Sequence, residues 1–148
     1  MEAFVALVRA NAAATRGLSA ELLEEHGLTI NDYECLLKIA RAEGGQLRRV
    51  DLSRELLLTP SGITRLLEGL ERAGYVERKN CAPDARVAYA ALTPAGRKKL
   101  KEASGSHVAS IRELFGARFT DEEMTTLARL LGRLEVENQD EEGACTIE

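Results

Sequence analysis

Three polar side chains recur in one short stretch of the sequence at the spacing of a helix face. Ser61, Thr64 and Arg65 stand at positions i, i+3 and i+4, so a helix would present all three on one side. Hydroxyl and guanidinium groups near the start of a helix can hydrogen-bond to base edges in the major groove of duplex DNA. The same residues could also form the solvated face of an ordinary helical hairpin. The neighbouring elements are needed to distinguish these two interpretations.

The stretch around these residues predicts a helix from Thr59 to Ala73. Thr59 is a favourable N-cap, and Pro60 suits the first helical position because its missing N–H costs nothing there. Gly74 is expected to end the helix in the left-handed conformation. The apolar positions recur at helical spacing and are Ile63, Leu66, Leu67 and Leu70. Because a shorter helix and a tight turn precede it, the stretch is a candidate helix-turn-helix.

The pattern changes from helical to extended after this helix. We expect strands over 75–79 and 86–92, joined by a turn over 80–85 in which Pro83 and Asp84 favour the reversal. A further strand of minimal length is predicted at 46–48. The segment therefore predicts a β-hairpin directly after the helix-turn-helix.

Long helices are expected towards both ends of the chain. Residues 2–26 predict one helix, and a shorter helix follows from the Thr29 cap. Two more are predicted, from Pro94 to about Phe115 and from the capping box Thr120–Glu123 to about Asn138. The terminal helices carry more apolar surface than slender helices can bury alone, which indicates an interface. The residues in question are Phe4, Val5, Val8, Leu127, Leu131 and Leu134.

The charges are unevenly distributed along the chain. The 148 residues carry a formal net charge of −4, and 45% of them are hydrophobic. Residues 46–101 nevertheless hold twelve Lys/Arg and six Asp/Glu, a net charge of +6, so the remainder carries −10. A basic central segment between acidic ends is typical of a lobe that binds a polyanion.

Composition also limits the other classes of protein that need consideration. No apolar run is long enough to span a membrane and the N-terminus lacks the basic start of a signal peptide, so we expect a cytoplasmic protein without membrane contact. The three cysteines, Cys35, Cys81 and Cys145, are odd in number and form no CxxC pair, which argues against a disulfide framework or a zinc site. The two histidines, His26 and His107, stand apart, and neither a phosphate-binding loop nor a catalytic triad is present. We therefore expect no enzyme, no cofactor, no metal and no catalytic residue.

The chain as a whole resembles the MarR family of bacterial and archaeal transcriptional regulators, over residues 2 to about 136. Four motifs in order carry the resemblance: Leu52-Ser-Arg-Glu-Leu56, the stretch from Thr59 to Arg78, Asp84-Ala-Arg86, and Leu92-Thr-Pro-Ala-Gly96. The resemblance implies a mainly α fold with a small β-hairpin (α+β), namely a winged helix-turn-helix with long N- and C-terminal dimerisation helices. It implies a single MarR-like domain over 1–138, with a DNA-binding lobe at 30–101 and dimerisation helices at 2–26 and 102–138. Residues 139–148 are expected to form an acidic, disordered tail.

The resemblance also implies roles for individual residues. Thr64 and Arg65 would contact base edges, and Ser61 a base or a phosphate. Arg86 would enter the minor groove, and Asp84 would either orient Arg86 or brace the wing. The family often has a second basic residue between these two, but this chain has Ala85, which leaves Arg78 and Lys79 to compensate. The full set of expected DNA-contacting residues is Arg48, Arg49, Arg54, Thr59, Ser61, Gly62, Thr64, Arg65, Arg78, Lys79, Asp84 and Arg86.

The function implied is that of a homodimeric, sequence-specific regulator bound to double-stranded DNA. Its operator would be pseudo-palindromic, with half-sites about 34 Å apart. The family's usual mode is repression, and members often bind small aromatic or anionic effectors. Arg16, His26, Tyr33 and Arg112 are the candidate effector-binding residues. One alternative is a redox-responsive regulator that senses oxidants through Cys81, and another is a winged helix used for protein contacts alone.

Overall fold

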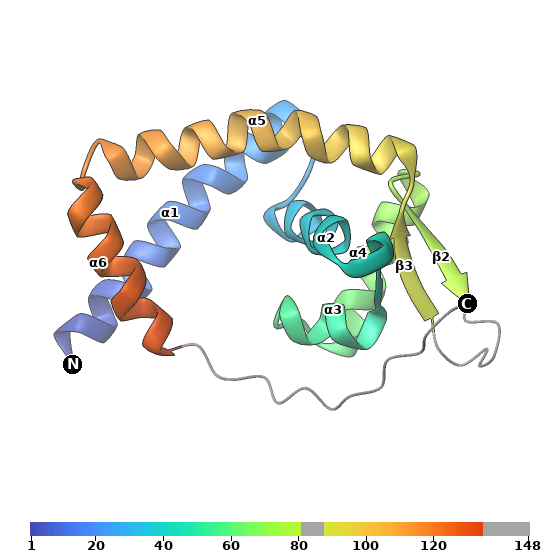
Figure 1. Cartoon of the computed structure of the whole chain (residues 1–148), viewed down its shortest axis with the longest axis horizontal. Helices are drawn as coiled ribbons and strands as arrows, with labels where there is room; N and C mark the ends of the chain where they lie inside the picture. The colour runs from blue at the N-terminus through green and yellow to red at the C-terminus, as the bar shows by residue number, and fades with distance from the viewer. Residues whose placement is uncertain (81–87, 135–148) are drawn as a thin grey trace. The chain divides into compact units, whose positions relative to one another are not determined.

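The computed structural model describes residues 1–80 and 88–134 (Figure 1). The chain divides into two compact units, residues 1–112 and 113–148. The first unit contains α1 (Glu2–His26), α2 (Ile30–Arg41), a 3₁₀ turn (Glu43–Gly45), β1 (Gln46–Arg48), α3 (Arg49–Glu55), α4 (Pro60–Arg72), β2 (Val76–Asn80) and β3 (Ala88–Leu92). Helix α5 (Pro94–Gly116) runs from the first unit into the second, which also contains α6 (Asp121–Leu131) and a 3₁₀ turn (Gly132–Leu134).

The predicted caps define the ends of most helices. A capping box opens α2, in which the Thr29 hydroxyl accepts from the Asp32 amide at 3.2 Å and the Asp32 carboxylate accepts from the Thr29 amide at 2.9 Å. The box predicted at the start of α6 is also present. The last α-helix ends at Leu131 rather than continuing to Asn138, because Gly132 is a poor helix former and the chain tightens into a 3₁₀ turn. Residues 135–138 lie outside the described ranges.

The strands form one antiparallel sheet in the order β1-β3-β2. The predicted hairpin strands β2 and β3 pair directly, and β1 pairs with the other edge of β3. In this register Arg48 and Lys79 both lie opposite Tyr89, one on each side. Directly opposed residues in an antiparallel pair point to the same face, so these three side chains form a row across the sheet.

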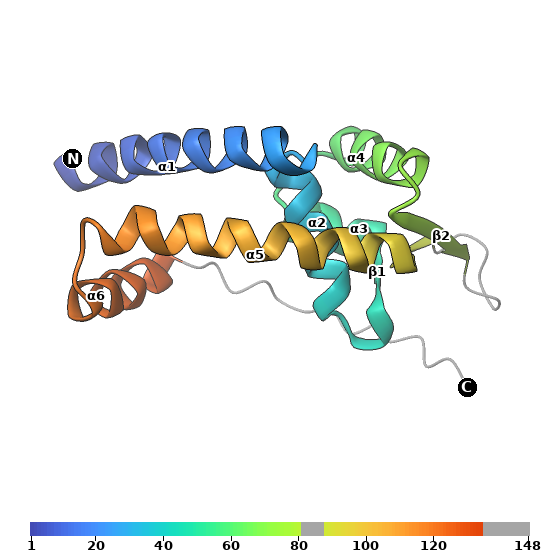
Figure 2. The same cartoon turned by 90° about the horizontal axis from the view of Figure 1, so that it is seen from above.

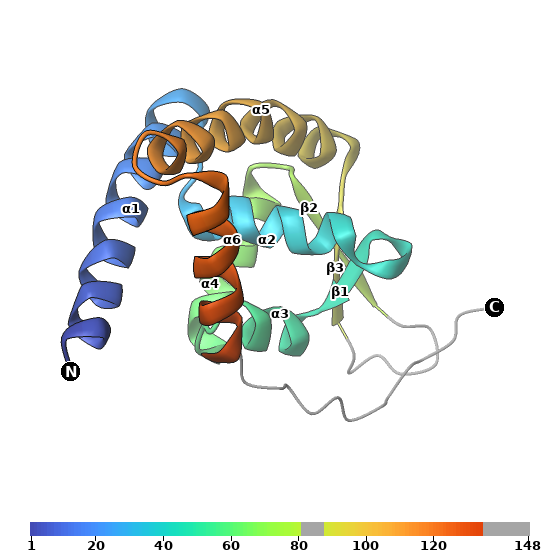
Figure 3. The same cartoon turned by 60° about the vertical axis from the view of Figure 1, so that its left-hand side comes forward.

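The hydrophobic core of the first unit is formed by α2, α3, α4 and the sheet, which Figure 3 shows beside one another, together with residues of α1 and α5. Each helix contributes its apolar face. The most deeply buried large side chains are Leu22, Leu28, Leu36, Ile39 and Leu52. Full burial of such a side chain contributes about 1.5–3 kcal/mol to stability. The same cluster includes Leu67 and Leu70 of α4 and Val76 of β2, so it fixes α4 relative to the sheet.

Hydrogen bonds join the C-terminal part of α1 and the start of α2 to α5, and Figure 2 shows the C-terminal end of α1 and the start of α2 close to α5. The His26 ring nitrogen Nε2 lies 2.7 Å from the Ser106 hydroxyl, and the Ser110 hydroxyl donates to Glu21. The Tyr33 hydroxyl donates to Ser104 at 3.3 Å. Among the described residues, no helix is long and apolar enough to cross a membrane.

The turn between α3 and α4 contains a non-glycine residue in the left-handed conformation. Leu57 has φ 53° and is 92% exposed. Two hydrogen bonds impose this geometry, since the Leu58 amide donates to the Ser53 carbonyl at 3.0 Å and the Ser53 hydroxyl donates to the Leu58 carbonyl at 2.6 Å. This is the position of a helix C-terminus at which glycine is usual.

Replacing Leu57 by glycine is therefore expected to leave the protein as stable or more stable. Relief of left-handed strain favours the variant by about 1–2 kcal/mol, and the greater freedom of glycine in the unfolded chain opposes it by about 0.5–1 kcal/mol. Urea unfolding of both proteins measures the difference. A clear loss of stability in the variant would mean that the leucine side chain makes stabilising contacts.

Candidate nucleic-acid interface

Helix α4 has one buried face and one exposed polar face. Ile63, Leu67 and Leu70 are buried in the core, whereas Ser61 and Arg65 are exposed. The Thr59 hydroxyl accepts from the Gly62 amide at 3.1 Å and lies 3.2 Å from the Ser61 hydroxyl. The N-terminal cap predicted from the sequence is thus present, and it leaves the first turns of α4 facing solvent with their polar groups.

The N-terminal cap of α4 leaves little room for a side chain at position 62. A Cβ atom at this position would lie 3.2 Å from the Thr59 Oγ1 and 3.6 Å from the Leu58 Cβ. The first contact is tighter than most Cβ contacts, so a side chain at this position would press against the hydroxyl of the N-cap. Gly62 therefore has a structural role in the helix start, whatever contact its backbone makes with a ligand.

Thr64 and Arg49 link the exposed face of α4 to α3. The Thr64 hydroxyl donates to the Pro60 carbonyl at 2.7 Å, and the Arg49 guanidinium donates to the same hydroxyl. Both side chains are half-buried. The structure therefore brings together two predicted site residues that are 15 positions apart in the sequence.

Arg48 is held in an ion pair beside the sheet. Its Nε and Nη2 atoms donate to the Asp51 carboxylate at 2.6 Å and 3.0 Å. The hydrogen bonds and charge of Asp51 raise the pKa of the Arg48 guanidinium above its usual value. Two of its donors are thus occupied within the protein, so Arg48 offers fewer of them to a phosphate than the sequence suggested.

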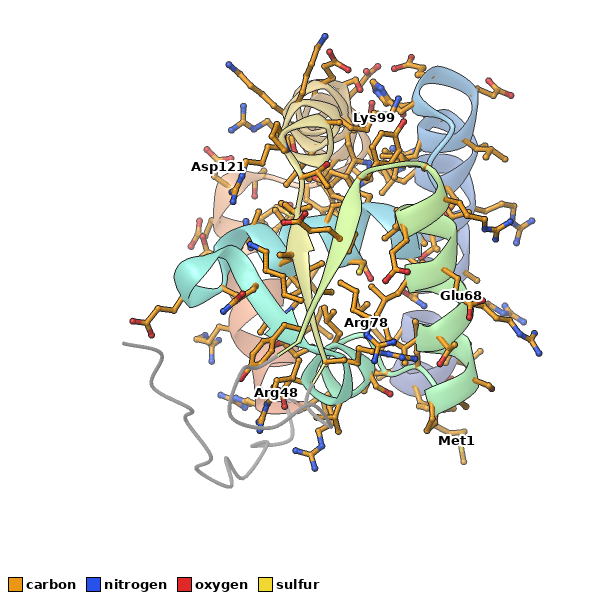
Figure 4. All side chains as sticks on the ribbon, turned by 90° about the vertical axis from the view of Figure 1, so that its right-hand side faces the viewer. Met1, Arg48, Glu68, Arg78, Lys99 and Asp121 are labelled. Carbon is orange, nitrogen blue, oxygen red and sulfur yellow. The ribbon has the colours of Figure 1, made fainter. Side chains whose placement is uncertain are left out.

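The remaining predicted cations that the structure describes are exposed. Arg54 lies on α3 and Arg78 on β2, and the Lys79 ammonium lies 3.3 Å from the Glu77 carboxylate. Figure 4 shows Arg48 and Arg78 towards one end of the lobe and Lys99, on α5, at the other. Described cations of segment 46–101 therefore lie at both ends of the lobe. Three predicted residues of the wing region, Cys81, Asp84 and Arg86, lie outside the described residues.

Comparison with known proteins identifies the family. The sequence pattern of the MarR family matches residues 26–87. AbsC, a MarR family transcriptional regulator from Streptomyces coelicolor, is 31% identical, and the match covers 89% of this chain and 88% of AbsC with a TM-score of 0.81. The chain belongs to the MarR family. The winged helix-turn-helix predicted from the sequence is thereby confirmed.

Two further relatives are similar over most of this chain. Sco3205, a MarR family transcriptional regulator from Streptomyces coelicolor whose structure is known in complex with DNA, is 25% identical with a TM-score of 0.83, covering 89% of this chain and 82% of Sco3205. The transcriptional repressor YetL from Bacillus subtilis is 29% identical over 108 residues. That match covers 73% of this chain but only 64% of YetL.

The four residues predicted to bind a MarR-type effector have different surroundings. Arg16 and Arg112 are exposed. His26 and Tyr33 are in contact with neighbouring residues of α5, and each hydrogen-bonds to a serine there. The structure thus places two of the four beside the same segment of α5, and the effector site stays a prediction.

His107 is a buried polar residue beside Tyr33. It was not among the predicted site residues. It is 5% exposed, and its Nδ1 atom has no hydrogen-bond partner among the described residues. The centroid of its ring lies 4.6 Å from that of the Tyr33 ring, in an edge-on arrangement. Its position could have been anticipated, since it continues the row Gly96, Leu100 and Ala103 on the buried face of α5. Burial lowers the pKa of the His107 imidazole, with Glu21 and Glu34 opposing and His26 adding to the effect.

Because the folded-state pKa of His107 lies below its ordinary value, acid should destabilise the protein. Below about pH 6.5 the unfolded chain binds a proton that the folded protein does not, so stability falls with decreasing pH by at most about 1.4 kcal/mol per pH unit. Urea unfolding of the wild type and His107→Leu at several pH values from 7.5 to 5 measures this slope. The leucine variant should show a shallower slope, and equal slopes would exclude His107 as their source.

Cys35 has the properties of an inert core residue. The thiol is fully buried on α2. Desolvation, with a smaller contribution from the Asp32 charge, raises its pKa to about 12. The thiol is therefore protonated at neutral pH and unreactive towards oxidants.

Proposed function

We propose that this MarR family protein is a sequence-specific transcriptional regulator that places α4 in the major groove of duplex DNA. The observation that carries the proposal is the exposed pair Ser61 and Arg65 on the first turns of α4, whose opposite face is buried in the core. A rigidly packed helix with exposed hydroxyl and guanidinium groups near its N-terminus has the equipment for base recognition. The likeness to Sco3205, which is known in complex with DNA, supports the same assignment.

The other predicted contacts serve to position the helix. Arg54, Arg78 and Lys79 are exposed cations on elements that flank α4, and such groups bind phosphates without selecting sequence. Arg86 would insert into the minor groove from the wing, where narrow A·T-rich segments attract a cation. Asp84 would orient Arg86 or brace the wing. These contacts contribute a salt-dependent part of the affinity.

Selection of bound sequences from random duplex DNA by the full chain tests the proposal. The expected product is a pseudo-palindromic motif whose half-sites are one helical turn apart. Recovery of no enriched motif, with binding that depends on salt but not on sequence, would contradict sequence-specific recognition. Repeating the selection with single-stranded DNA controls for general polyanion binding.

The regulator is proposed to act as a homodimer. The first turns of α1 carry an exposed apolar surface, with Phe4 66% and Val8 51% exposed and Val5 and Leu7 beside them in the sequence. The second unit, considered by itself, exposes Leu130, Leu131 and Leu134. Apolar surfaces of this kind on a soluble protein usually mark an interface, and a two-fold axis would match a palindromic site.

Replacing both Phe4 and Val8 by glutamate is expected to convert the dimer to a monomer, because two buried charges would be left without partners. Light scattering coupled to size-exclusion chromatography measures the mass. Asn11→Glu, an exposed polar position of the same helix, is the control and should leave the dimer intact. Persistence of a dimer in the double variant would place the interface elsewhere.

The regulator is further proposed to be a repressor released by a small aromatic or anionic effector. The relative YetL is a repressor, and His26 and Tyr33 lie at the junction of α1 and α2 with α5, from which a ligand could act on the DNA-binding elements. A redox response through Cys81 is the alternative. Operator binding is measured with candidate ligands and after peroxide treatment: release by a ligand supports the effector, and binding that survives peroxide removes the redox alternative.

A further inference from the structure

The hydroxyl group of Thr64 takes part in two hydrogen bonds within the protein. Its hydroxyl proton is donated to the Pro60 carbonyl, and the hydroxyl oxygen accepts from Arg49. Turning the hydroxyl towards a base would break both of these hydrogen bonds. The γ-methyl group takes part in neither hydrogen bond. Thr64 therefore differs from Ser61 and Arg65, whose polar groups are exposed on the same stretch of helix.

The methyl group has one obvious counterpart in the major groove. Thymine presents a C5-methyl group there, whereas the exposed edges of the other bases present hydrogen-bonding groups. We propose that Thr64 recognises a thymine in each half-site through contact between its γ-methyl group and the thymine methyl. This inference rests on the proposed function and specifies one base of the operator.

Arg49 acts as a positioning residue for the Thr64 side chain. It lies at the start of α3, is half-buried, and its guanidinium holds the Thr64 side chain from the neighbouring helix. Threonine in a helix otherwise divides between two rotamers, since its hydroxyl can bond to more than one preceding carbonyl. The hydrogen bond from Arg49 favours the rotamer in which the hydroxyl is bonded to Pro60, and it thereby fixes the direction of the γ-methyl group.

Deoxyuridine provides a direct test because it lacks only the methyl group of thymine. In the duplex selected by the wild type, each symmetric pair of thymines is replaced in turn by deoxyuridine and the affinity of the full chain is measured. Replacement of one of these thymine pairs should weaken binding by about fourfold per half-site, as expected for loss of one buried methyl group. Wild-type binding that tolerates uracil at every position overturns the proposal.

Two near-isosteric variants separate the methyl group from the hydroxyl. Thr64→Val keeps the methyl group and should keep the uracil penalty, whereas Thr64→Ser keeps the hydroxyl and should lose it. The reverse result would show that the hydroxyl makes the contact and would overturn the proposal. Circular dichroism and urea unfolding verify that both variants are folded. Thr64 is only half-buried, which favours their folding.

A third variant tests the role of Arg49. Arg49→Met should reduce the uracil penalty, because the Thr64 side chain is no longer held. If Arg49 serves only as a phosphate contact, the variant instead lowers the salt dependence of binding by about one unit of slope and leaves the uracil penalty unchanged, which overturns the positioning role. Absence of any selected duplex for the wild type would overturn the proposed function itself, which distinguishes that failure from failure of the thymine contact.

Discussion

Replacing Gly96 by alanine is expected to lower the free energy of unfolding by about 3 kcal/mol, the upper part of the range for overpacking a tight site. A Cβ atom at this position would lie 2.0 Å from the Tyr75 carbonyl oxygen, a backbone atom that cannot rotate away. The first turn of α5 would have to move away from the segment preceding β2. Chemical denaturation of the variant and the wild type measures the loss.

The displacement would also damage a hydrogen-bonded junction. The Thr93 amide donates to the Tyr75 carbonyl at 3.1 Å, and the Thr93 hydroxyl donates to the Gly74 carbonyl at 2.6 Å. The hydroxyl also accepts from the Gly96 amide at 3.0 Å and so caps α5. This junction joins the end of α4 to the start of α5, so its loss should loosen the whole lobe.

Gly105→Ala is the matched control, since it adds the same methyl group in the same helix. Nothing lies within 4 Å of a Cβ atom at Gly105, and alanine is the better helix former by about 1 kcal/mol. This variant should therefore be more stable than the wild type. Equal changes in stability in the Gly96 and Gly105 variants would show that the close approach at Tyr75 is relaxed in solution. A Gly96 variant as stable as the wild type would show the same.

Replacing Arg65 by alanine is expected to weaken operator binding by about 1–3 kcal/mol and to relax selection at one base pair of each half-site. The side chain is exposed on the polar face of α4, and an arginine there can donate two hydrogen bonds to the O6 and N7 atoms of a guanine. The core residues of α4 are untouched, so the fold should persist. Fluorescence anisotropy with the selected duplex and its single-base variants measures both effects.

Lys99→Ala removes a charge of the same sign from α5, at the end of the lobe away from Arg48 and Arg78 (Figure 4), and is the control for electrostatics. It should change binding little and leave base selection as in the wild type. If Arg65→Ala and Lys99→Ala weaken binding equally and selection is unchanged in both, Arg65 acts only through its charge. That result would remove α4 as the element that recognises bases.

Local chemistry explains why the helix-turn-helix could be predicted from the sequence. Thr59 and Pro60 specify the start of α4 and Gly74, with φ 75°, follows its end, so the bounds depend on neighbouring residues alone. The hairpin was recognisable from its change of period. The pairing of β1 with β3 was not, because a strand of three residues carries no pattern that identifies its partner.

The exposed members of the site could be predicted, but their connections could not. Helical spacing places Ser61 and Arg65 on one face without any knowledge of the fold. The contact of Arg49 with Thr64 depends on how α3 packs against α4, which no local pattern specifies. The pairing of Arg48 with Asp51 three residues later is a local signal, and attention to that spacing would have indicated that Arg48 is partly neutralised.

The most direct measurement of the central claim is a titration of the full wild-type chain onto its selected duplex and onto a scrambled duplex of the same composition, at several salt concentrations. Sequence-specific recognition by α4 predicts that two chains bind per palindrome, with a preference for the selected duplex of about 10³-fold or more at physiological salt. The affinities for both duplexes should fall as salt increases. Equal affinity for the two duplexes at every salt concentration would contradict the account.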